Sequence, residues 1–233
     1  VRSSAASDVY KRQIIVAMDK EKSLLLPLLG DIKTSRCDGF EIETGRVGRH
    51  EVAVMKCGIG KVNAAMGTMA LIDTFRPELV INTGVAGGTG AGAKILDVVA
   101  ADRVSYHDVW CGFSTIPGQA DGCPLFFEPP RQILELPALS GAKKGLVCSG
   151  DRFISKAEEV SVIRALYPDA LAVDMESAAI AHVCHRRDTA FVCLRVVSDT
   201  PGDADNISQY EGFWDKAPRE TFTTIVSLLD EIA

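Results

Sequence analysis

The sequence lacks three features that would place the protein at a membrane, outside the cell or on a nucleic acid. No apolar run approaches the roughly 20 residues that a membrane-spanning helix needs. The first residues, VRSSAASDVYKRQ, contain no apolar core of the kind found in secretory signal peptides. Basic residues number 25 against 31 acidic ones, whereas nucleic-acid binding generally requires a basic surface. We therefore expect no membrane partner and no nucleic-acid partner.

The sequence also lacks any Cys-x-x-Cys pair, although it contains seven cysteines. Their scattered positions and odd number favour free thiols in a reducing, cytoplasmic setting over a disulfide framework. His182 and His185 would share one face of a helix, but no carboxylate beside them completes a set of metal ligands. We expect these histidines to be core or surface residues and to bind no metal.

The first thirteen residues differ in character from the rest of the chain. The segment is polar and begins with Val1, and its end, DVYKRQ, resembles the translation of a sequencing-adapter end. We expect residues 1–13 to be a disordered segment that is not native to the protein. Residues 14–233 are then expected to form a single domain.

The remaining chain alternates between two apolar patterns. Apolar residues form 47% of the sequence, which is enough for a sizeable core. Short apolar runs predict strands at residues 14–17, 40–44, 51–57, 79–82, 95–104, 145–149, 171–173 and 191–197. Apolar residues at helical spacing predict helices at residues 19–29, 61–73, 156–166, 175–186 and 222–232. The Gly- and Pro-rich residues 108–142 predict a long loop with a short helix. This alternation is typical of an α/β domain with a central mixed β-sheet flanked by helices.

A glycine-rich run, INTGVAGGTGAG at residues 81–92, indicates a place where the backbone closely approaches another group. Residues 88–93 match G-x-G-x-x-A, but a dinucleotide-binding fingerprint needs a helix to begin at this loop. Here the glycines lead into ILDVVAADRV, a pattern typical of a strand. GIGK at residues 58–61 has Val62 where a Walker A loop needs Ser or Thr, and it lacks the first glycine of that loop. The sequence therefore disfavours both nucleotide-phosphate motifs.

Five short motifs rich in glycine or small residues, with carboxylates among them, follow the expected strands. They are GIGK (58–61), NTGVAGG (82–88), SGDRFI (149–154), VDMES (173–177) and RVVSD (195–199). In open α/β sheets, ligands bind beyond the carboxyl ends of the strands. The five motifs therefore predict one common site.

These five motifs, in this order, resemble the nucleoside phosphorylase and hydrolase superfamily, and in particular its 5′-methylthioadenosine/S-adenosylhomocysteine nucleosidases. The resemblance runs from about Ile14 to the C-terminus. It implies the three-layer nucleoside phosphorylase-like fold, a catalytic domain over residues 14–233, and no metal or organic cofactor. It also implies hydrolysis of the N-glycosidic bond of 5′-methylthioadenosine or S-adenosylhomocysteine, which would release adenine and a 5′-thio-ribose.

Cleavage of an N-glycosidic bond to adenine needs a general acid, because adenine leaves poorly as an anion. Asp199, in Val-Val-Ser-Asp, follows a buried strand, where desolvation can raise the pKa of a carboxyl group. The resemblance implies that Asp199 protonates the purine. The alternative is that Ser198 and Asp199 simply cap the following turn.

The sugar carries positive charge in the transition state, and a nearby carboxylate would stabilise it. Glu176 lies in an almost wholly apolar helix, and a buried carboxylate there needs a partner. The resemblance implies that ribose hydroxyls are this partner and that Met175 lines the sugar pocket. The alternatives are a salt bridge from Glu176 to Arg195 and a plain core position for Met175.

Glu21 follows the first expected strand, and the resemblance implies that it orients and activates the attacking water. In the phosphorylases of the superfamily this region carries a Gly-Asp-Pro motif and a phosphate-binding Arg, and residues 14–35 contain neither. Lys20 and Lys22 could contact an anion, but Glu21 would repel phosphate. The sequence therefore favours hydrolysis over phosphorolysis, with Asp19 as the alternative to Glu21 if the register differs.

The resemblance also implies how the base and the sugar are held. Phe153 would stack on the base, and backbone groups of Ile154 would recognise its Watson–Crick edge. The glycine-rich run would let the backbone approach the ribose, with no phosphate needed. The other substrate-binding residues that the resemblance implies are Ile59, Val85, Ala86, Gly87, Asp174 and Ser198.

Two residues depart from the family pattern. Val85 stands where many members have Ser, so one polar contact near the sugar is missing. Pro201, two residues after Asp199, has no N–H, so a backbone donor that could tune the acid is absent there. Both departures leave open which 5′-substituted adenosine is preferred.

An aromatic segment, YHDVWCGF at residues 106–113, matches a family region that reaches the pocket of the neighbouring subunit. This match makes Trp110 and Phe113 candidates for the partner's pocket and implies a homodimer. Burial of these rings within their own chain is the alternative.

Other functions stay open at this point. A purine nucleoside phosphorylase would reveal itself by a requirement for phosphate. A nucleosidase for another 5′-modified adenosine, such as aminodeoxyfutalosine, would share the same carboxylates. The joint presence of Glu21, Glu176 and Asp199 argues against a catalytically inactive nucleoside-binding protein. A dinucleotide-dependent oxidoreductase is a further alternative.

Overall fold

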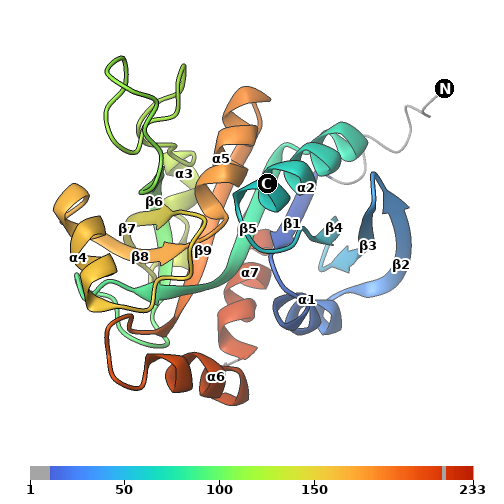
Figure 1. Ribbon diagram of the computed structural model, residues 1–233. Coiled ribbons are helices and arrows are strands. Elements are labelled where there is room, and N and C mark those ends of the chain that lie inside the picture. The colour runs from blue at the N-terminus through green and yellow to red at the C-terminus, as the bar shows by residue number, and fades with distance from the viewer. Residues whose placement is uncertain (1–10, 217–218, 233) are drawn as a thin grey trace.

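The computed structural model describes residues 11–216 and 219–232 of the chain, which contain nine strands and seven α-helices (Figure 1). The strands are β1 (Arg12–Val16), β2 (Gly30–Cys37), β3 (Phe40–Val47), β4 (His50–Lys56), β5 (Leu79–Gly88), β6 (Val98–Tyr106), β7 (Lys143–Ser149), β8 (Ala170–Asp174) and β9 (Ala190–Asp199). The helices are α1 (Asp19–Leu25), α2 (Lys61–Phe75), α3 (Arg131–Leu134), α4 (Ala157–Leu166), α5 (Ser177–Arg186), α6 (Asn206–Lys216) and α7 (Arg219–Glu231).

All nine strands belong to one mixed sheet, in the order β2-β3-β4-β1-β5-β8-β7-β6-β9. β5 runs parallel to both β1 and β9, and its last residues, Gly87 and Gly88, turn to pair antiparallel with β8. Because β9 also pairs with β6, the strands β5, β9, β6, β7 and β8 close into a ring. The expected α/β domain with a central mixed sheet flanked by helices is confirmed.

Side chains of the central strands point alternately to the two faces of the sheet, and helices pack on both faces. Ile15 and Val80 belong to a core cluster that includes α2 and α5, which lie side by side in Figure 1. Their chain neighbours Ile14 and Ile81 belong to a second cluster, which includes residues of α1 and α7. Since successive residues of a strand point to opposite faces, β1 and β5 are buried on both faces of the sheet. No helix in the described ranges is both long and apolar enough to cross a membrane.

The structure differs from the expected elements in three places: two elements that the sequence analysis did not predict, and one strand that begins later than expected. β2 was not expected, because this edge strand is exposed along almost its whole length and shows no apolar alternation; its pairing with β3 comes from the backbone. α6 was also not expected, because it follows a Pro–Gly turn and its sequence, NISQYEGFWDK, is largely polar. Residues 95–97 form a turn with Leu96 at positive φ, so the expected strand begins three residues later, at Val98.

The expected boundary after residue 13 is two residues too late. Arg12 and Gln13 belong to β1, where Gln13 is fully buried and pairs with Ala53 of β4 and Val80 of β5. These two residues therefore form part of the sheet. Residues 1–10 of the expected disordered segment lie outside the described residues.

The packing of α4 against β7 and β8 gives a direct test of the fold. Ile163 is 3% exposed in the core cluster beneath α4, whereas its neighbour Val162 is 70% exposed. Ile163→Ala should lower the free energy of unfolding by about 2–5 kcal/mol, because it leaves a cavity. Val162→Ala should change it by less than about 0.5 kcal/mol. Urea denaturation measures both, and equal losses would contradict this packing.

Candidate active site

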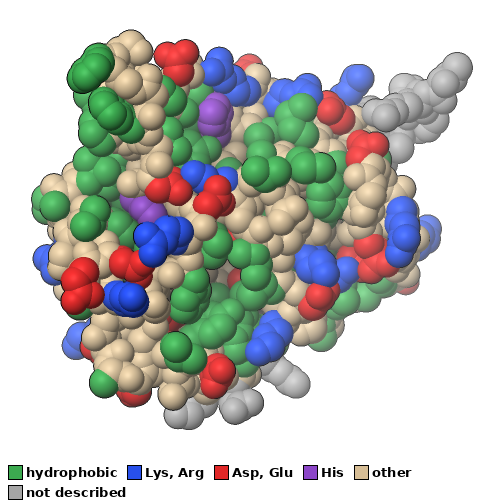
Figure 2. Space-filling view, in the orientation of Figure 1, with side chains coloured by type: hydrophobic (Ala, Val, Ile, Leu, Met, Phe, Trp, Pro, Cys, Tyr) green, Lys and Arg blue, Asp and Glu red, His purple; other side chains and the backbone are tan. Residues whose placement is uncertain are grey.

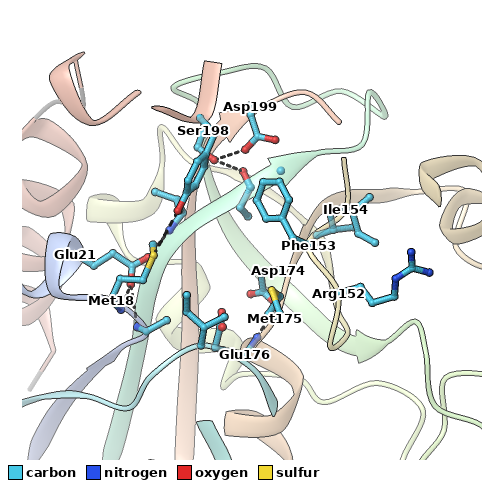
Figure 3. Close-up of a pocket in the computed structure, with 17 residues that line it drawn as sticks. Met18, Glu21, Arg152, Phe153, Ile154, Asp174, Met175, Glu176, Ser198 and Asp199 are labelled. Atoms are coloured by element: carbon cyan, nitrogen blue, oxygen red, sulfur yellow. Dashed lines mark hydrogen bonds between the residues drawn. The ribbon is translucent and has the colours of Figure 1, made fainter. Parts of the chain in front are cut away.

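One cavity opens at the carboxyl ends of six strands, β1, β4, β5, β7, β8 and β9. Figure 3 shows Glu21, Glu176 and Asp199 on three sides of it. All twelve residues that the sequence predicts for the active site line this cavity: Glu21, Ile59, Val85, Ala86, Gly87, Phe153, Ile154, Asp174, Met175, Glu176, Ser198 and Asp199. Five further residues complete the lining: Ala17, Met18, Arg152, Val173 and Tyr210.

Three backbone N–H groups hold the carboxylate of Glu21. Its Oε2 accepts hydrogen bonds from Ala17 N (2.9 Å) and Met18 N (3.0 Å), and its Oε1 accepts one from Val85 N (3.0 Å). The bond to Met18 places Glu21 at the third position of α1 in a capping arrangement. Burial raises the pKa of Glu21, while Arg195 and the three N–H groups oppose this rise. The carboxylate is thereby fixed in one orientation at the cavity wall.

Asp19, the alternative to Glu21, points elsewhere. Its side chain is largely exposed and forms an ion pair with Lys56, with Oδ2 2.7 Å from Nζ, and it is not among the residues that line the cavity. The geometry therefore favours Glu21 over Asp19.

The glycine-rich run makes room for groups of the protein itself. A Cβ at Gly84 would collide with Glu21 Oε1, and a Cβ at Gly87 would lie 2.8 Å from the ring of Pro201. β5 ends within the run at Gly88, and the next regular element is β6. The helix that a dinucleotide fingerprint needs is absent from the described segment between these strands.

Glu176 occupies the N-cap of α5, directly after β8. Its Oε1 accepts a hydrogen bond from Gly60 N in the GIGK motif (2.9 Å), and no hydrogen bond within the described residues engages Oε2. Burial and the neighbouring charge of Asp174 raise the pKa of Glu176 to about 7, against the opposing effect of Arg195. Glu176 is thus a buried carboxyl group with one oxygen still available to a ligand.

The salt bridge considered between Glu176 and Arg195 is not formed. Arg195 Nε instead donates to Asp174 Oδ2 (2.7 Å), and Arg195 Nη2 donates to Asn82 Oδ1 (2.6 Å). Hydroxyl groups of Ser149 and Ser177 also donate to the Asp174 carboxylate. Asp174 lines the cavity, but both of its oxygens are bound by protein groups. Asp174 therefore links β8 to β7 and β9 at the cavity wall and does not offer a free carboxylate to a ligand.

Asp199 ends β9 and is almost fully buried. Its Oδ1 accepts a hydrogen bond from Ser198 Oγ, and its Oδ2 accepts one from Asn206 Nδ2 of α6. Burial raises the pKa of Asp199, and these two hydrogen bonds oppose the rise. Within the described residues no backbone N–H donates to this carboxyl group, so the turn-capping alternative does not apply.

An aromatic wall closes one side of the cavity. Phe153 is half exposed, and its ring meets Tyr210 of α6 edge-on at 5.5 Å between centroids. Tyr210 Oη in turn donates to Met18 Sδ (3.4 Å). The sequence analysis missed Met18 and Tyr210. The spacing of Tyr210, Phe213 and Trp214, which matches one face of a helix, is the signal that could have revealed α6.

Trp110 and Phe113 lie outside the cavity. Both are exposed, and they pack edge-on against each other at 5.7 Å between centroids. The alternative of burial within their own chain is therefore wrong.

His182 lies between Tyr106 and Cys123, with hydrogen bonds of 3.1 Å to Tyr106 Oη and 3.0 Å to Cys123 Sγ. Across residues 11–216 and 219–232, no group of three His, Cys, Asp or Glu side chains is placed to hold a metal ion.

Comparisons with known proteins all point to one superfamily. The family model of the phosphorylase superfamily matches residues 11–229. An S-adenosylhomocysteine nucleosidase from Streptococcus pyogenes, solved with 5-methylthiotubericidin, is 33% identical, with a TM-score of 0.91 over 98% of this chain and 99% of that chain. A 5′-methylthioadenosine/S-adenosylhomocysteine nucleosidase from Colwellia psychrerythraea, solved with adenine, is 34% identical, with a TM-score of 0.89 over 96% of each chain.

A mutant of the futalosine hydrolase of Helicobacter pylori is also similar, with 27% identity and a TM-score of 0.86 over 96% of this chain and all of that chain. The family match covers nearly the whole chain, and the two nucleosidases exceed 30% identity at almost full coverage. The chain therefore belongs to the phosphorylase superfamily.

Proposed function

We propose that the protein hydrolyses the N-glycosidic bond of 5′-methylthioadenosine, S-adenosylhomocysteine or both, and releases adenine and the 5′-thio-ribose. The observation that carries this proposal is the arrangement of Glu21, Glu176 and Asp199, three buried carboxyl groups from different strand ends around one cavity. The similar nucleosidases, solved with 5-methylthiotubericidin and with adenine, support the same substrate class.

Asp199 is the proposed general acid. Because burial raises the pKa of Asp199, the group can keep its proton closer to neutral pH than an exposed Asp would. As the bond between the sugar and the base breaks, the bonding electrons move to adenine and Asp199 protonates the purine ring. Adenine then leaves as a neutral molecule. The edge-on pair of Phe153 and Tyr210 supports a planar base stacked at this end of the cavity.

Glu21 is the proposed group that orients and activates water. Its three N–H partners hold the carboxylate at the cavity wall, so it can accept a proton from a water molecule beside the sugar. Glu176, with one oxygen still available, is the proposed partner of the ribose hydroxyls. In its charged form, either carboxylate also favours the positively charged sugar of the transition state.

The charges around the cavity favour water over phosphate as the attacking group. Arg152 is the one Lys or Arg among the described lining residues, and it pairs with Glu159 at 2.7 Å. Lys22, a cation near Glu21 in sequence, is bound by Glu41 and Glu43. Lys20, the other candidate cation, does not line the cavity, and its Nζ lies over the ring of Trp214 at 5.3 Å from the centroid. A phosphate ion in the cavity would therefore meet the Glu21 carboxylate with no unpaired Lys or Arg among the described lining residues to balance it.

A nucleoside with a different 5′ substituent is the alternative substrate. The similarity to a futalosine hydrolase supports another 5′-modified nucleoside as the alternative substrate. The carboxyl groups of the site do not distinguish between these substrates, because they would act on the base and the ribose that the substrates share.

We also propose a homodimer. Val62, Met66 and Met69 are exposed along α2 at spacings of four and three residues, which places them on one face of that helix. Figure 2 shows hydrophobic side chains over α2 and over the loop that follows β6, the loop that carries Trp110 and Phe113. Such an apolar surface suits a second copy of the chain better than water.

We further propose a cytoplasmic location. Free cysteines at all seven positions support a reducing setting of this kind.

The proposed reaction predicts a product that does not depend on phosphate. The purified protein should convert 5′-methylthioadenosine to adenine and a reducing sugar at the same rate with and without phosphate. Chromatography of the base and a reducing-sugar assay measure both products. Adenine that forms only with phosphate, together with a sugar 1-phosphate, would make the protein a phosphorylase. Absence of adenine from every 5′-modified adenosine tested would contradict the proposal.

The proposed homodimer predicts that a charge on α2 breaks the assembly. Met66→Glu would bury an unpaired carboxylate in the interface, so light scattering should give the mass of a monomer where the wild-type protein gives that of a dimer. Val162→Glu, at an exposed position on α4, is the matched control and should leave the dimer intact. A wild-type monomer at micromolar concentration, or a dimeric Met66→Glu variant, would refute the proposed interface.

A further inference from the structure

The buried side chain of Asn206 lies behind the carboxyl group of Asp199. Asn206 begins α6, and its Nδ2 donates to Asp199 Oδ2, on the opposite oxygen from Ser198. The Oδ1 of Asn206 is buried and has no hydrogen-bond partner within the described residues. A buried amide with an unsatisfied oxygen is unfavourable for folding. Within the described residues, the hydrogen bond to Asp199 is therefore the one that the Asn206 side chain makes.

The turn after β9 supplies no backbone donor to Asp199. Thr200 N donates to Gln209 Oε1 (2.9 Å), Gly202 N donates to Ser155 O (3.0 Å), and Pro201 between them has no N–H. The ring of Pro201 instead packs over Gly87 at the end of β5. Across the cavity, Val85 has no hydroxyl group to offer. Within the described residues, the hydrogen bonds to the Asp199 carboxyl group come from two side chains, Ser198 and Asn206.

We infer that Asn206 is a positioning residue of the general acid: its amide holds Asp199 Oδ2 and so fixes the carboxyl group in the place where a backbone donor is missing at Pro201. This inference rests on the proposed function, in which Asp199 protonates the base. An amide nitrogen has two N–H groups and no lone pair to offer, so Oδ2 must present a lone pair to Asn206. The acidic proton is thereby kept away from the Asn206 side of the group.

After proton transfer, the same contact has a second effect. The carboxylate of Asp199 is left charged in a buried position, where an uncompensated charge is costly. The hydroxyl of Ser198 and the amide of Asn206 then stabilise it, one on each oxygen. Asn206 thus opposes the rise that burial causes in the pKa of Asp199, and its removal should raise that pKa further.

The charged or titratable groups that line the cavity with Asp199 are Glu21, Asp174, Glu176, Arg152 and Tyr210. None of them makes a hydrogen bond or ion pair with Asn206 within the described residues. A change in the titration of Asp199 on replacement of Asn206 therefore reports their direct contact.

The test compares two substitutions that cut links between the same segments. Asn206→Leu removes the donor to Asp199. Gln209→Leu removes the hydrogen bond from Thr200 N and the hydrogen bonds to the exposed carboxylates of Asp203 and Asp205, but it breaks no contact with the Asp199 carboxyl group. Asn206→Leu should lower kcat by about 10- to 100-fold with little change in KM, and the alkaline limb of the kcat/KM profile should move to higher pH. Gln209→Leu should leave that limb where it is.

A readout independent of turnover separates this inference from the proposed function. The carboxyl carbon of Asp199, assigned by its loss in Asp199→Asn, can be titrated by NMR in each variant. The titration midpoint should lie at higher pH in Asn206→Leu than in the wild-type protein and Gln209→Leu. Asn206→Asp, which keeps the side-chain shape, should shift it in the same direction, because two neighbouring carboxyl groups repel each other.

An unshifted midpoint in both Asn206 variants, or an equal shift in Gln209→Leu, would overturn the inference. A wild-type protein that releases no adenine would instead overturn the proposed function, and the NMR titration would still decide whether Asn206 holds the carboxyl group.

Discussion

A buried ion pair between Arg195 and Asp174 is the constraint on which the site depends. Both side chains are at most 2% exposed, and the pair joins β9 to β8. Asn82 on β5, Ser149 on β7 and Ser177 on α5 complete its hydrogen bonds. A buried pair of this kind adds little net stability, but it is strongly destabilising when one partner is lost. Its main consequence here is geometric, because it fixes the strand ends from which the ligand-facing carboxyl groups project.

The three carboxyl groups around the cavity differ in environment, and this difference supports different roles for them. Glu21 is surrounded by backbone N–H donors, Glu176 has one such donor and a pKa of about 7, and Asp199 has two side-chain donors. The positive charge of Arg195 lowers the pKa of both Glu21 and Glu176 and so favours their charged forms. General acid–base catalysis requires one group that keeps its proton and another that gives its proton up, and different environments can set the pKa values of two carboxyl groups apart in this way. The proposed division of labour follows: Asp199 gives a proton, Glu21 receives one, and Glu176 holds the sugar.

Much of the site could be predicted from sequence, because strand ends of an α/β sheet converge in space wherever the strands occur in the chain. The five motifs, two of which contain Glu176 and Asp199, and the segment with Glu21 after the first strand were therefore sufficient to locate the cavity. Tyr210 and Asn206 were not predictable in this way, since they come from α6, a helix with a polar sequence whose position depends on packing against β9. The role of Gly84 also required the structure. Only the fold shows that a Cβ there would collide with the carboxylate of a residue 63 positions earlier in the chain.

The central claim is that Glu21, held at the cavity wall, activates the attacking water. The most direct measurement is single-turnover cleavage of 5′-methylthioadenosine by Glu21→Gln, alongside equilibrium binding of the same substrate. The matched control is Asp19→Asn, which alters an exposed carboxylate two residues away that pairs with Lys56. The account predicts that Glu21→Gln binds substrate but cleaves it at least about 100-fold more slowly, while Asp19→Asn cleaves at the wild-type rate. Wild-type cleavage by Glu21→Gln would contradict the account.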